Sequence, residues 1–171
     1  MSGAVLRGVR GVICAALLCT SLFGCSRDEA PADTSSTKYL YDEVFNPCRE
    51  MPSKFLSEHQ LETTPEPNDN LIDGYIYWGC EYPGQAYDFG VYVSNMPLSA
   101  LGHTHAVKPA QIAGRAAKIQ SLPLEKISCN LYIEMTGGLL ALGLTLKSPI
   151  EACPTLSTVA EDLVPLLPPG V

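Results

Sequence analysis

Between residues 75 and 94, apolar and polar positions alternate with the period of a β-strand, and Pro83-Gly84 interrupts the alternation once. A proline–glycine pair between two alternating segments is typical of a turn, so the pattern predicts a hairpin of two strands. One face of this hairpin is mostly apolar and carries Ile76, Trp78, Cys80, Tyr82, Tyr87, Phe89, Val91 and Val93. We expect this face, including Trp78, to belong to the core.

Three further strands are predicted after the hairpin. Residues 111–122 indicate one strand that is interrupted at Gly114-Arg115, whereas residues 127–135 alternate cleanly. Gly137-Gly138 is a two-residue turn of the kind favoured in hairpins. The last strand then carries an inward-facing series of Leu140, Leu142, Leu144 and Leu146. In contrast, the polar segment 63–70 predicts a turn-rich loop.

A helix is predicted on each side of the strands. At the first, Asn46 can cap a helix that begins at Pro47, although Pro52 would divide that helix into two short pieces. At the second, residues 148–151 have the form of a capping box, with Pro154 as an alternative start. The order of helix, five strands and helix predicts an α+β fold. We expect an antiparallel sheet of about five strands, with the N- and C-terminal helices packed on one face.

The N-terminal segment has the layout of a secretory signal peptide. Arg7 and Arg10 precede residues 11–23, which are apolar and uncharged. This stretch is shorter than the roughly 20 residues that a membrane-spanning helix needs. Residues 22–25 read Leu-Phe-Gly-Cys and resemble the bacterial lipobox, in which the cysteine receives diacylglycerol. The sequence therefore predicts cleavage before Cys25 and a lipid anchor on Cys25, at the outer face of the cell membrane.

Residues 26–38 contain no aromatic residue and no aliphatic residue larger than Ala. Such a segment cannot bury enough apolar surface to offset its chain entropy, so we expect a flexible tether. The predicted organisation is a signal peptide over residues 1–24, a lipidated linker over residues 25–40 and one globular domain over residues 41–169.

The acidic charge argues against one class of partner. Of the 11 basic residues, Arg7 and Arg10 leave with the signal peptide, so 9 remain against 18 acidic residues and the formal net charge is −9. An acidic domain repels phosphate backbones, and we therefore predict no nucleic-acid partner. Attachment to the membrane is expected to come from the lipid on Cys25, not from the protein surface.

Four of the seven cysteines remain once the two in the signal peptide and the lipidated Cys25 are set aside. An even number in an oxidising compartment predicts two disulfides, for which three pairings are possible. We favour Cys48 with Cys80 and Cys129 with Cys153. Each of these bonds would join a helix to a strand that packs beside it, and Cys80 and Cys129 both face the predicted helices.

Metal and catalytic sites find little support in the sequence. A four-cysteine zinc site normally shows closely spaced cysteine pairs, which are absent here. Residues 68–74 resemble a calcium loop only in part, because the ligand spacing fails and the final bidentate Glu is missing. His103 and His105 lack further ligands nearby in the sequence. Motifs for nucleophilic catalysis, phosphate binding and dinucleotide binding are also missing, so we predict no metal, no cofactor and no enzymatic activity.

One group of side chains suggests a binding surface. Tyr75, Tyr77, Tyr92 and Tyr132 fall at strand positions that face away from the predicted helices. Exposed tyrosines are common at interfaces because they present rigid, amphipathic area. Tyrosine also has a high strand propensity, so an ordinary exposed sheet face explains the pattern as well.

Several short motifs carry a resemblance to a known family. They are residues 45–48 (Phe-Asn-Pro-Cys), 78–80 (Trp-Gly-Cys) and 114–117 (Gly-Arg-Ala-Ala), followed by Cys129 and Cys153. With this spacing the chain resembles a family of actinobacterial envelope lipoproteins catalogued as a domain of unknown function, over residues 41–168. Asn46 stands where the family more often has Asp, and both can cap. The resemblance implies an envelope lipoprotein and supplies no catalytic residues.

Three functions are compatible with these observations. The first is a membrane-tethered binding or sensor module for an envelope protein, a lipid or a cell-wall fragment. The second is a structural protein that docks an envelope complex, and the third is an envelope hydrolase with an unfamiliar site. A large apolar cavity would favour a lipid, a flat tyrosine-rich face a protein, and buried carboxylates in a cleft an enzyme.

Overall fold

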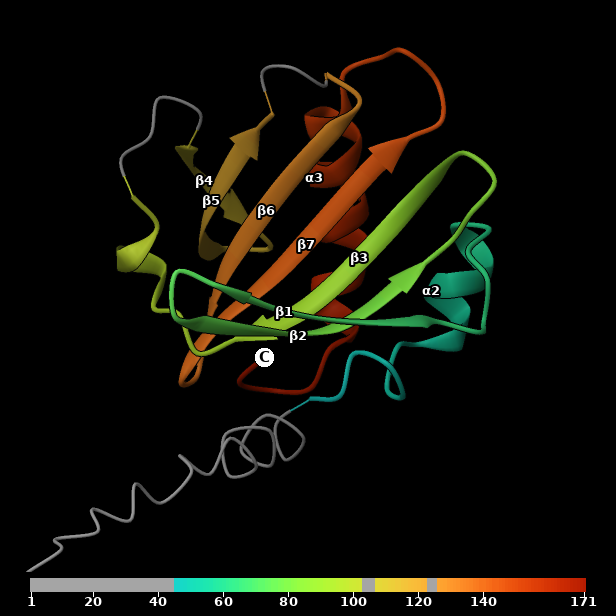
Figure 1. Cartoon of the computed structure of the whole chain (residues 1–171). Coiled ribbons are helices and arrows are strands. Elements are labelled where there is room, and N and C mark those ends of the chain that lie inside the picture. The colour runs from blue at the N-terminus through green and yellow to red at the C-terminus, as the bar shows by residue number, and fades with distance from the viewer. Residues whose placement is uncertain (1–44, 103–106, 123–125) are drawn as a thin grey trace, which may run out of the picture. The chain divides into compact units, whose positions relative to one another are not determined.

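The described strands of the protein form one antiparallel sheet in the order β1-β2-β3-β7-β6-β5-β4 (Figure 1). The structure is a computed structural model that describes residues 45–102, 107–122 and 126–171. The α+β class is confirmed, but the described sheet has seven strands where about five were predicted. The strands are β1 Glu66–Ile72, β2 Tyr75–Tyr82, β3 Tyr87–Ser94, β4 Val107–Ile112, β5 Arg115–Ser121, β6 Ser128–Met135 and β7 Gly138–Leu146.

Strand β1 corrects the predicted loop over residues 63–70. It pairs with β2 along its whole length, from Glu66 opposite Glu81 to Ile72 opposite Tyr75. Its side chains are almost all exposed, so no apolar alternation marks it in the sequence. This strand is therefore held by backbone hydrogen bonds to β2 and not by the burial of its side chains.

The prediction of one interrupted strand over residues 111–122 is also wrong. Strands β4 and β5 form a hairpin in which Ile112 pairs with Arg115. The turn between them consists of Ala113 and Gly114, with φ of 48° and 77°. Two consecutive residues with positive φ reverse the chain in a tight turn. The break at Gly114-Arg115 is therefore the end of one strand and the start of the next.

The helices begin later than predicted. Asn46 caps a turn instead of a helix, because its Oδ1 accepts a hydrogen bond from the backbone N–H of Cys48 at 3.0 Å. Helix α2 (Ser53–Glu58) starts only after Pro52. Helix α3 (Ala152–Leu163) follows Glu151, so the predicted capping box lies before the helix. Short 3₁₀ turns, η1 (Leu98–Ala100) and η2 (Val164–Leu166), complete the described elements.

The main core lies between the helices and one face of the sheet. Helix α3 packs against β4 to β7, and Phe55 of α2 contacts Phe89 of β3 with their ring centroids 5.8 Å apart. Trp78 is half-buried against this core, on the predicted side of the sheet. No helix in the described ranges is both long enough and apolar enough to cross a membrane.

The two disulfides have the predicted pairing. Cys48 is bonded to Cys80, and Cys129 to Cys153. The first joins the turn before α2 to β2, and the second joins β6 to the first turn of α3. Both bonds lie on the helix side of the sheet, where Cys80 and Cys129 are fully buried.

The opposite face of the sheet is curled. In Figure 1 the β1–β2 hairpin runs in front of β3 and β7, while α3 lies behind them. A second, smaller core forms on this concave face, separate from the helix-side core. Its buried members are Tyr77, Met96, Tyr132, Leu139 and Ala141.

Candidate functional site

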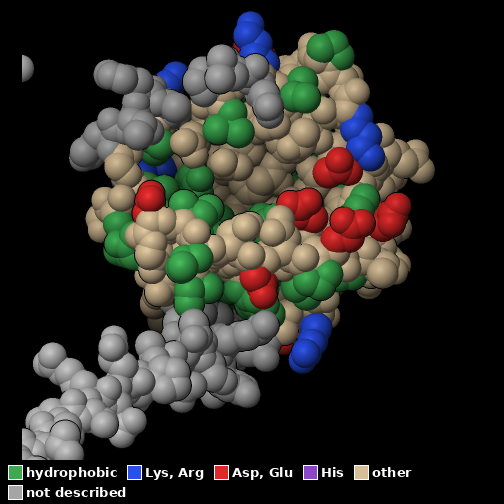
Figure 2. All heavy atoms as spheres, in the orientation of Figure 1, with side chains coloured by type: hydrophobic (Ala, Val, Ile, Leu, Met, Phe, Trp, Pro, Cys, Tyr) green, Lys and Arg blue, Asp and Glu red, His purple; other side chains and the backbone are tan. Residues whose placement is uncertain are grey.

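The concave face holds a cavity of about 460 Å³, which we call the tyrosine groove. Its walls come from the β1–β2 hairpin on one side and from η1 with the start of β4 on the other, and β5 to β7 form its floor. Figure 2 views this face and shows the hollow, with acidic side chains gathered along one side of it. The described lining residues are Asn68, Asn70, Ile72, Asp73, Tyr77, Glu81, Tyr92, Met96, Ala100, Leu101, Gly102, Val107, Gln120, Asn130, Tyr132, Ala141, Leu142 and Gly143.

A glycine, Gly143, keeps the floor of the groove open. The strand register places Glu81, Gly90, Gly143, Asn130 and Gln120 in one row across five strands. A Cβ atom added to Gly143 would lie 3.5 Å from Oδ1 of Asn130, with nothing else within 4 Å. Because side chains of one row project from the same face, the space above Gly143 exists only while that position has no side chain.

Gly90 serves a different purpose in the same row. A Cβ atom there would lie 2.6 Å from the ring of Tyr92, a distance that real Cβ atoms do not tolerate. The glycine therefore lets the Tyr92 ring lie flat over the backbone. This position of the ring brings the Tyr92 hydroxyl to Glu81.

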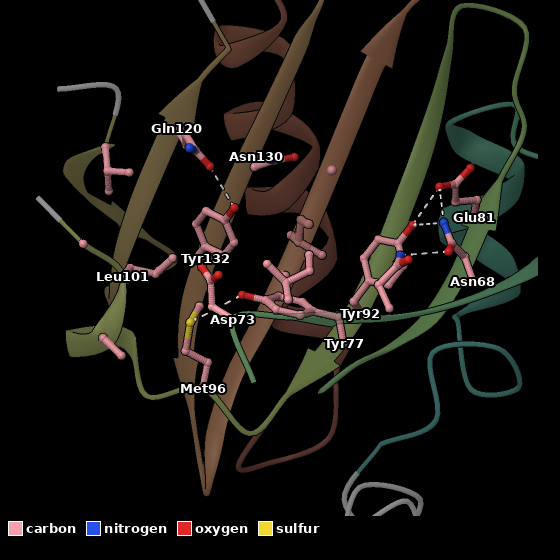
Figure 3. Close-up of a pocket in the computed structure, with 18 residues that line it drawn as sticks. Asn68, Asp73, Tyr77, Glu81, Tyr92, Met96, Leu101, Gln120, Asn130 and Tyr132 are labelled. Carbon is pink, nitrogen blue, oxygen red and sulfur yellow. Dashed lines mark hydrogen bonds between the residues drawn. The ribbon is translucent and has the colours of Figure 1, made fainter. Parts of the chain in front are cut away.

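Hydrogen bonds fix the polar side chains at both sides of the groove (Figure 3). On β1 to β3, the Tyr92 hydroxyl donates to Oε1 of Glu81 at 2.8 Å, and Nδ2 of Asn68 donates to the same oxygen at 2.8 Å. On β5 and β6, the Tyr132 hydroxyl donates to Oε1 of Gln120 at 2.9 Å. These bonds hold the rings and the carboxylate in defined orientations.

Tyr77 is fixed mainly by packing. Its hydroxyl lies 3.5 Å from the Met96 sulfur, a weak acceptor, and its ring belongs to the concave-face core. The ring thus forms part of the wall between β2 and the loop that follows β3.

Burial keeps the groove phenols protonated. It raises the pKa of Tyr77 to about 12, with smaller contributions that include the negative charge of Asp73. Burial also raises the pKa of Tyr132. It raises the pKa of Tyr92 as well, and there the hydrogen bond to Glu81 and the negative charge of Glu81 act in the same direction. Near neutral pH all three hydroxyls can therefore donate hydrogen bonds.

The structure brings three of the four predicted tyrosines together. Tyr77, Tyr92 and Tyr132 line the groove, whereas Tyr75 packs beside them without lining it. The expectation of an exposed face is wrong, because Tyr77 and Tyr132 are only 8% and 9% exposed. The sheet curls, and residues of the loop after β3 cover the rings.

Sequence reasoning missed most of the polar lining. Asn68 and Asn70 fall in the segment predicted as a loop, and Gln120 falls in the segment predicted as one interrupted strand. Strand alternation does place Glu81 on the same face as Tyr77, and Asn130 on the same face as Tyr132, and these were the available signals. The row from Glu81 to Gln120 can be recognised only when it is known which strands, far apart in the sequence, pair with each other.

Other predicted sites have different outcomes. Cys25, His103 and His105 lie outside the described residues. Asn68 and Asn70 are on β1, where Nδ2 of Asn70 donates to Oδ1 of Asn68 at 2.9 Å. Within the described ranges, no three His, Cys, Asp or Glu side chains are grouped so as to hold a metal ion.

A second polar cluster joins both helices to the sheet. Nδ1 of His59 lies 2.8 Å from the Tyr87 hydroxyl, and its Nε2 lies 3.5 Å from Oδ2 of Asp162. Burial, and to a smaller extent the charge of Asp162, raises the pKa of Tyr87 to about 12. These contacts tie α2 to β3 and α3, and we interpret the cluster as structural.

Comparison of the chain with protein-family models, with curated proteins and with solved structures finds no match.

Proposed function

We propose that the protein is a non-enzymatic binding module of the cell envelope and that the tyrosine groove is its ligand site. The observation that carries the proposal is Gly143, which leaves space on the floor of the groove where β7 would otherwise project a side chain. Gly90, in the same row on β3, lets the Tyr92 ring lie flat beside that space. Hydrogen-bonding groups on both walls surround that space, an arrangement typical of ligand pockets.

The shape of the site supports a small ligand. A docking surface for a folded protein is generally broad, whereas this face is hollowed and its tyrosine rings are mostly buried. A lipid tail calls for a predominantly apolar cavity, but Asn68, Glu81, Gln120 and Asn130 all line this one. The groove therefore fits a small molecule, or a fragment of a larger one, that carries hydrogen-bonding groups.

The location of the module comes from the sequence alone. The basic start, the apolar stretch and the Leu-Phe-Gly-Cys ending support export and attachment of a lipid to Cys25. The predicted tether over residues 26–38 would then connect the anchor to the domain. The proposed arrangement, in keeping with the resemblance to actinobacterial lipoproteins, is a groove presented to the envelope from the outer face of the cell membrane.

The experiment is a comparison of ligand capture by two valine variants. Gly143→Val fills the floor of the groove, whereas Ala116→Val adds bulk at an exposed position of β5 that is not among the described lining residues. Each immobilised protein is incubated with a small-molecule extract of cell envelopes, and retained compounds are identified by mass spectrometry. We expect the wild-type protein and Ala116→Val to retain a compound that Gly143→Val does not. Equal retention by both variants, with both folded, would refute the groove as the site.

A further inference from the structure

The charged groups among the described lining residues of the groove have the same sign. Glu81 and Asp73 are the charged residues among the described lining residues, which include no Lys, Arg or His. In Figure 3, Glu81 lies beside Tyr92, and Asp73 lies nearer to Tyr77 and Met96. The two carboxylates therefore lie at different places along the groove. Their field disfavours an anionic ligand and favours a cationic one.

Glu81 is held as an acceptor without a cationic partner in the described part of the chain. Its Oε1 accepts from Tyr92 and from Asn68, and both of those donors are neutral. The hydrogen bonds orient the carboxylate but do not cancel its charge. Its other oxygen, Oε2, accepts no hydrogen bond from the described residues, so it is available to a ligand donor.

The phenols report the same electrostatic environment. Burial is the main reason that the pKa of Tyr92 is raised, but the negative charge of Glu81 contributes as well. Asp73 acts in the same direction on Tyr77. A field that makes a phenolate less stable makes a cation at the same place more stable.

Two of the phenol oxygens in the groove also suit a ligand that donates hydrogen bonds. Tyr132 already donates its proton to Gln120, so its oxygen can only accept from a ligand. The same holds for Tyr77, whose hydroxyl is directed at Met96. Electron-rich tyrosine rings attract cations in addition.

We propose that the tyrosine groove selects a small organic cation with a primary ammonium group, and that Glu81 is the residue that determines this specificity. This proposal rests on the groove being a ligand site. The ammonium donates to the Glu81 carboxylate beside the Tyr92 ring, while Asp73 adds to the negative field. A second ammonium on the same molecule would lie toward Asp73.

The test uses three probes with the same carbon chain and different ends. Cadaverine carries ammonium groups, pentanediol carries hydroxyls and glutarate carries carboxylates. Binding of each probe to the full chain is followed by NMR titration. We expect cadaverine to bind more tightly than pentanediol, and glutarate not to bind. Equal binding of cadaverine and pentanediol, tighter binding of glutarate, or no binding of cadaverine at millimolar concentration would overturn the proposal.

Two glutamine variants separate a local charge from the overall charge. Glu81→Gln keeps an oxygen that can accept from Tyr92 and Asn68, so the fold and the ring position are expected to persist. Glu134→Gln removes the same charge from an exposed position of β6 that does not line the groove. We expect Glu81→Gln to weaken cadaverine binding about threefold to tenfold and Glu134→Gln to change it less than twofold. Equal effects of the two variants would contradict a specificity role for Glu81.

Gly143→Val distinguishes failure of this inference from failure of the proposed function. If Gly143→Val binds cadaverine as the wild type does, the groove is not the site and both proposals fall. If Gly143→Val loses binding while Glu81→Gln keeps it unchanged, the groove stands and the inference about charge falls.

Discussion

Replacing Tyr77 by Ala tests whether the concave face is packed. The Tyr77 side chain is 8% exposed and belongs to a buried cluster with Met96, Tyr132, Leu139 and Ala141. Removing a buried aromatic ring generally costs about 3–5 kcal/mol, through lost burial and the cavity left behind. Because the groove borders this ring and admits water, we expect about 2–4 kcal/mol in the free energy of unfolding. A solvent-facing tyrosine would cost well under about 1 kcal/mol.

Two further variants measure the contribution of the Tyr77 hydroxyl and that of a neighbouring ring on the same strand. Tyr77→Phe loses a weak contact with the Met96 sulfur at 3.5 Å, so we expect a loss of less than about 1 kcal/mol. Tyr75→Ala removes a half-buried ring from the same strand and the same face, and we expect an intermediate loss.

The assay is urea unfolding of the disulfide-bonded protein, monitored by circular dichroism. The free energies of unfolding are compared between variants that show the same dependence on urea concentration. The expected order of destabilisation is Tyr77→Ala, then Tyr75→Ala, then Tyr77→Phe. If Tyr77→Ala stays within about 1 kcal/mol of the wild type, the ring is not packed and our description of the concave face is wrong.

Three other predictions concern pH, anchoring and the first disulfide. Burial raises the pKa of Tyr82 from 10.0 to about 12, so the stability contributed by its neutral form is complete below pH 10 and is lost as the pH rises toward 12. The urea concentration at the unfolding midpoint should therefore fall over this pH interval, and should fall less steeply in Tyr82→Phe. An equal decrease of the midpoint with pH in both proteins would count against the effect. Replacing Cys25 by Ala should leave uncleaved precursor or release protein into the medium, as shown by immunoblots of membrane and medium fractions; acylated, membrane-bound protein in this variant would disprove the anchor. The double variant Cys48→Ser/Cys80→Ser removes a disulfide that spans a sequence separation of 32, and its free energy of unfolding in urea should fall by about 3–4 kcal/mol. A decrease below about 1 kcal/mol would contradict the expected chain-entropy effect.

Local patterns were sufficient for the parts of the fold that bury one face. The β2–β3 hairpin and the β6–β7 hairpin follow from apolar alternation that ends at turn residues. The disulfide pairing followed once Cys80 and Cys129 were assigned to the helix side of the sheet. In each case neighbouring residues in the sequence carry the information.

The missed strands lack apolar alternation for identifiable reasons. Strand β1 exposes nearly all of its side chains, so burial left no pattern in it. A turn signal was present beside β1 and was overlooked, because Asp73-Gly74 has positive φ at both residues and Asp-Gly is a recognised hairpin signal. The corresponding β4–β5 turn places Ala113 at φ 48°, which is unusual for Ala and concealed the hairpin.

The groove depends on information that no local segment contains. The row from Glu81 to Gln120 crosses five strands, and its members are neighbours only because β3 pairs with β7. Because the sheet curls, the face that was expected to be exposed forms a hollow. Sequence alternation identified the face on which Tyr77, Tyr92 and Tyr132 lie, but not its shape.

The most direct measurement of the central claim is an NMR map of backbone amide shifts as the compound retained from the envelope extract is added to the full chain. Our account predicts that the largest changes occur on the concave face, at Gly143, Asn130 and Gln120, and that the exposed residues Thr158 and Glu161 of α3 change little. Shifts concentrated on α3, with the floor of the groove unaffected, would contradict it.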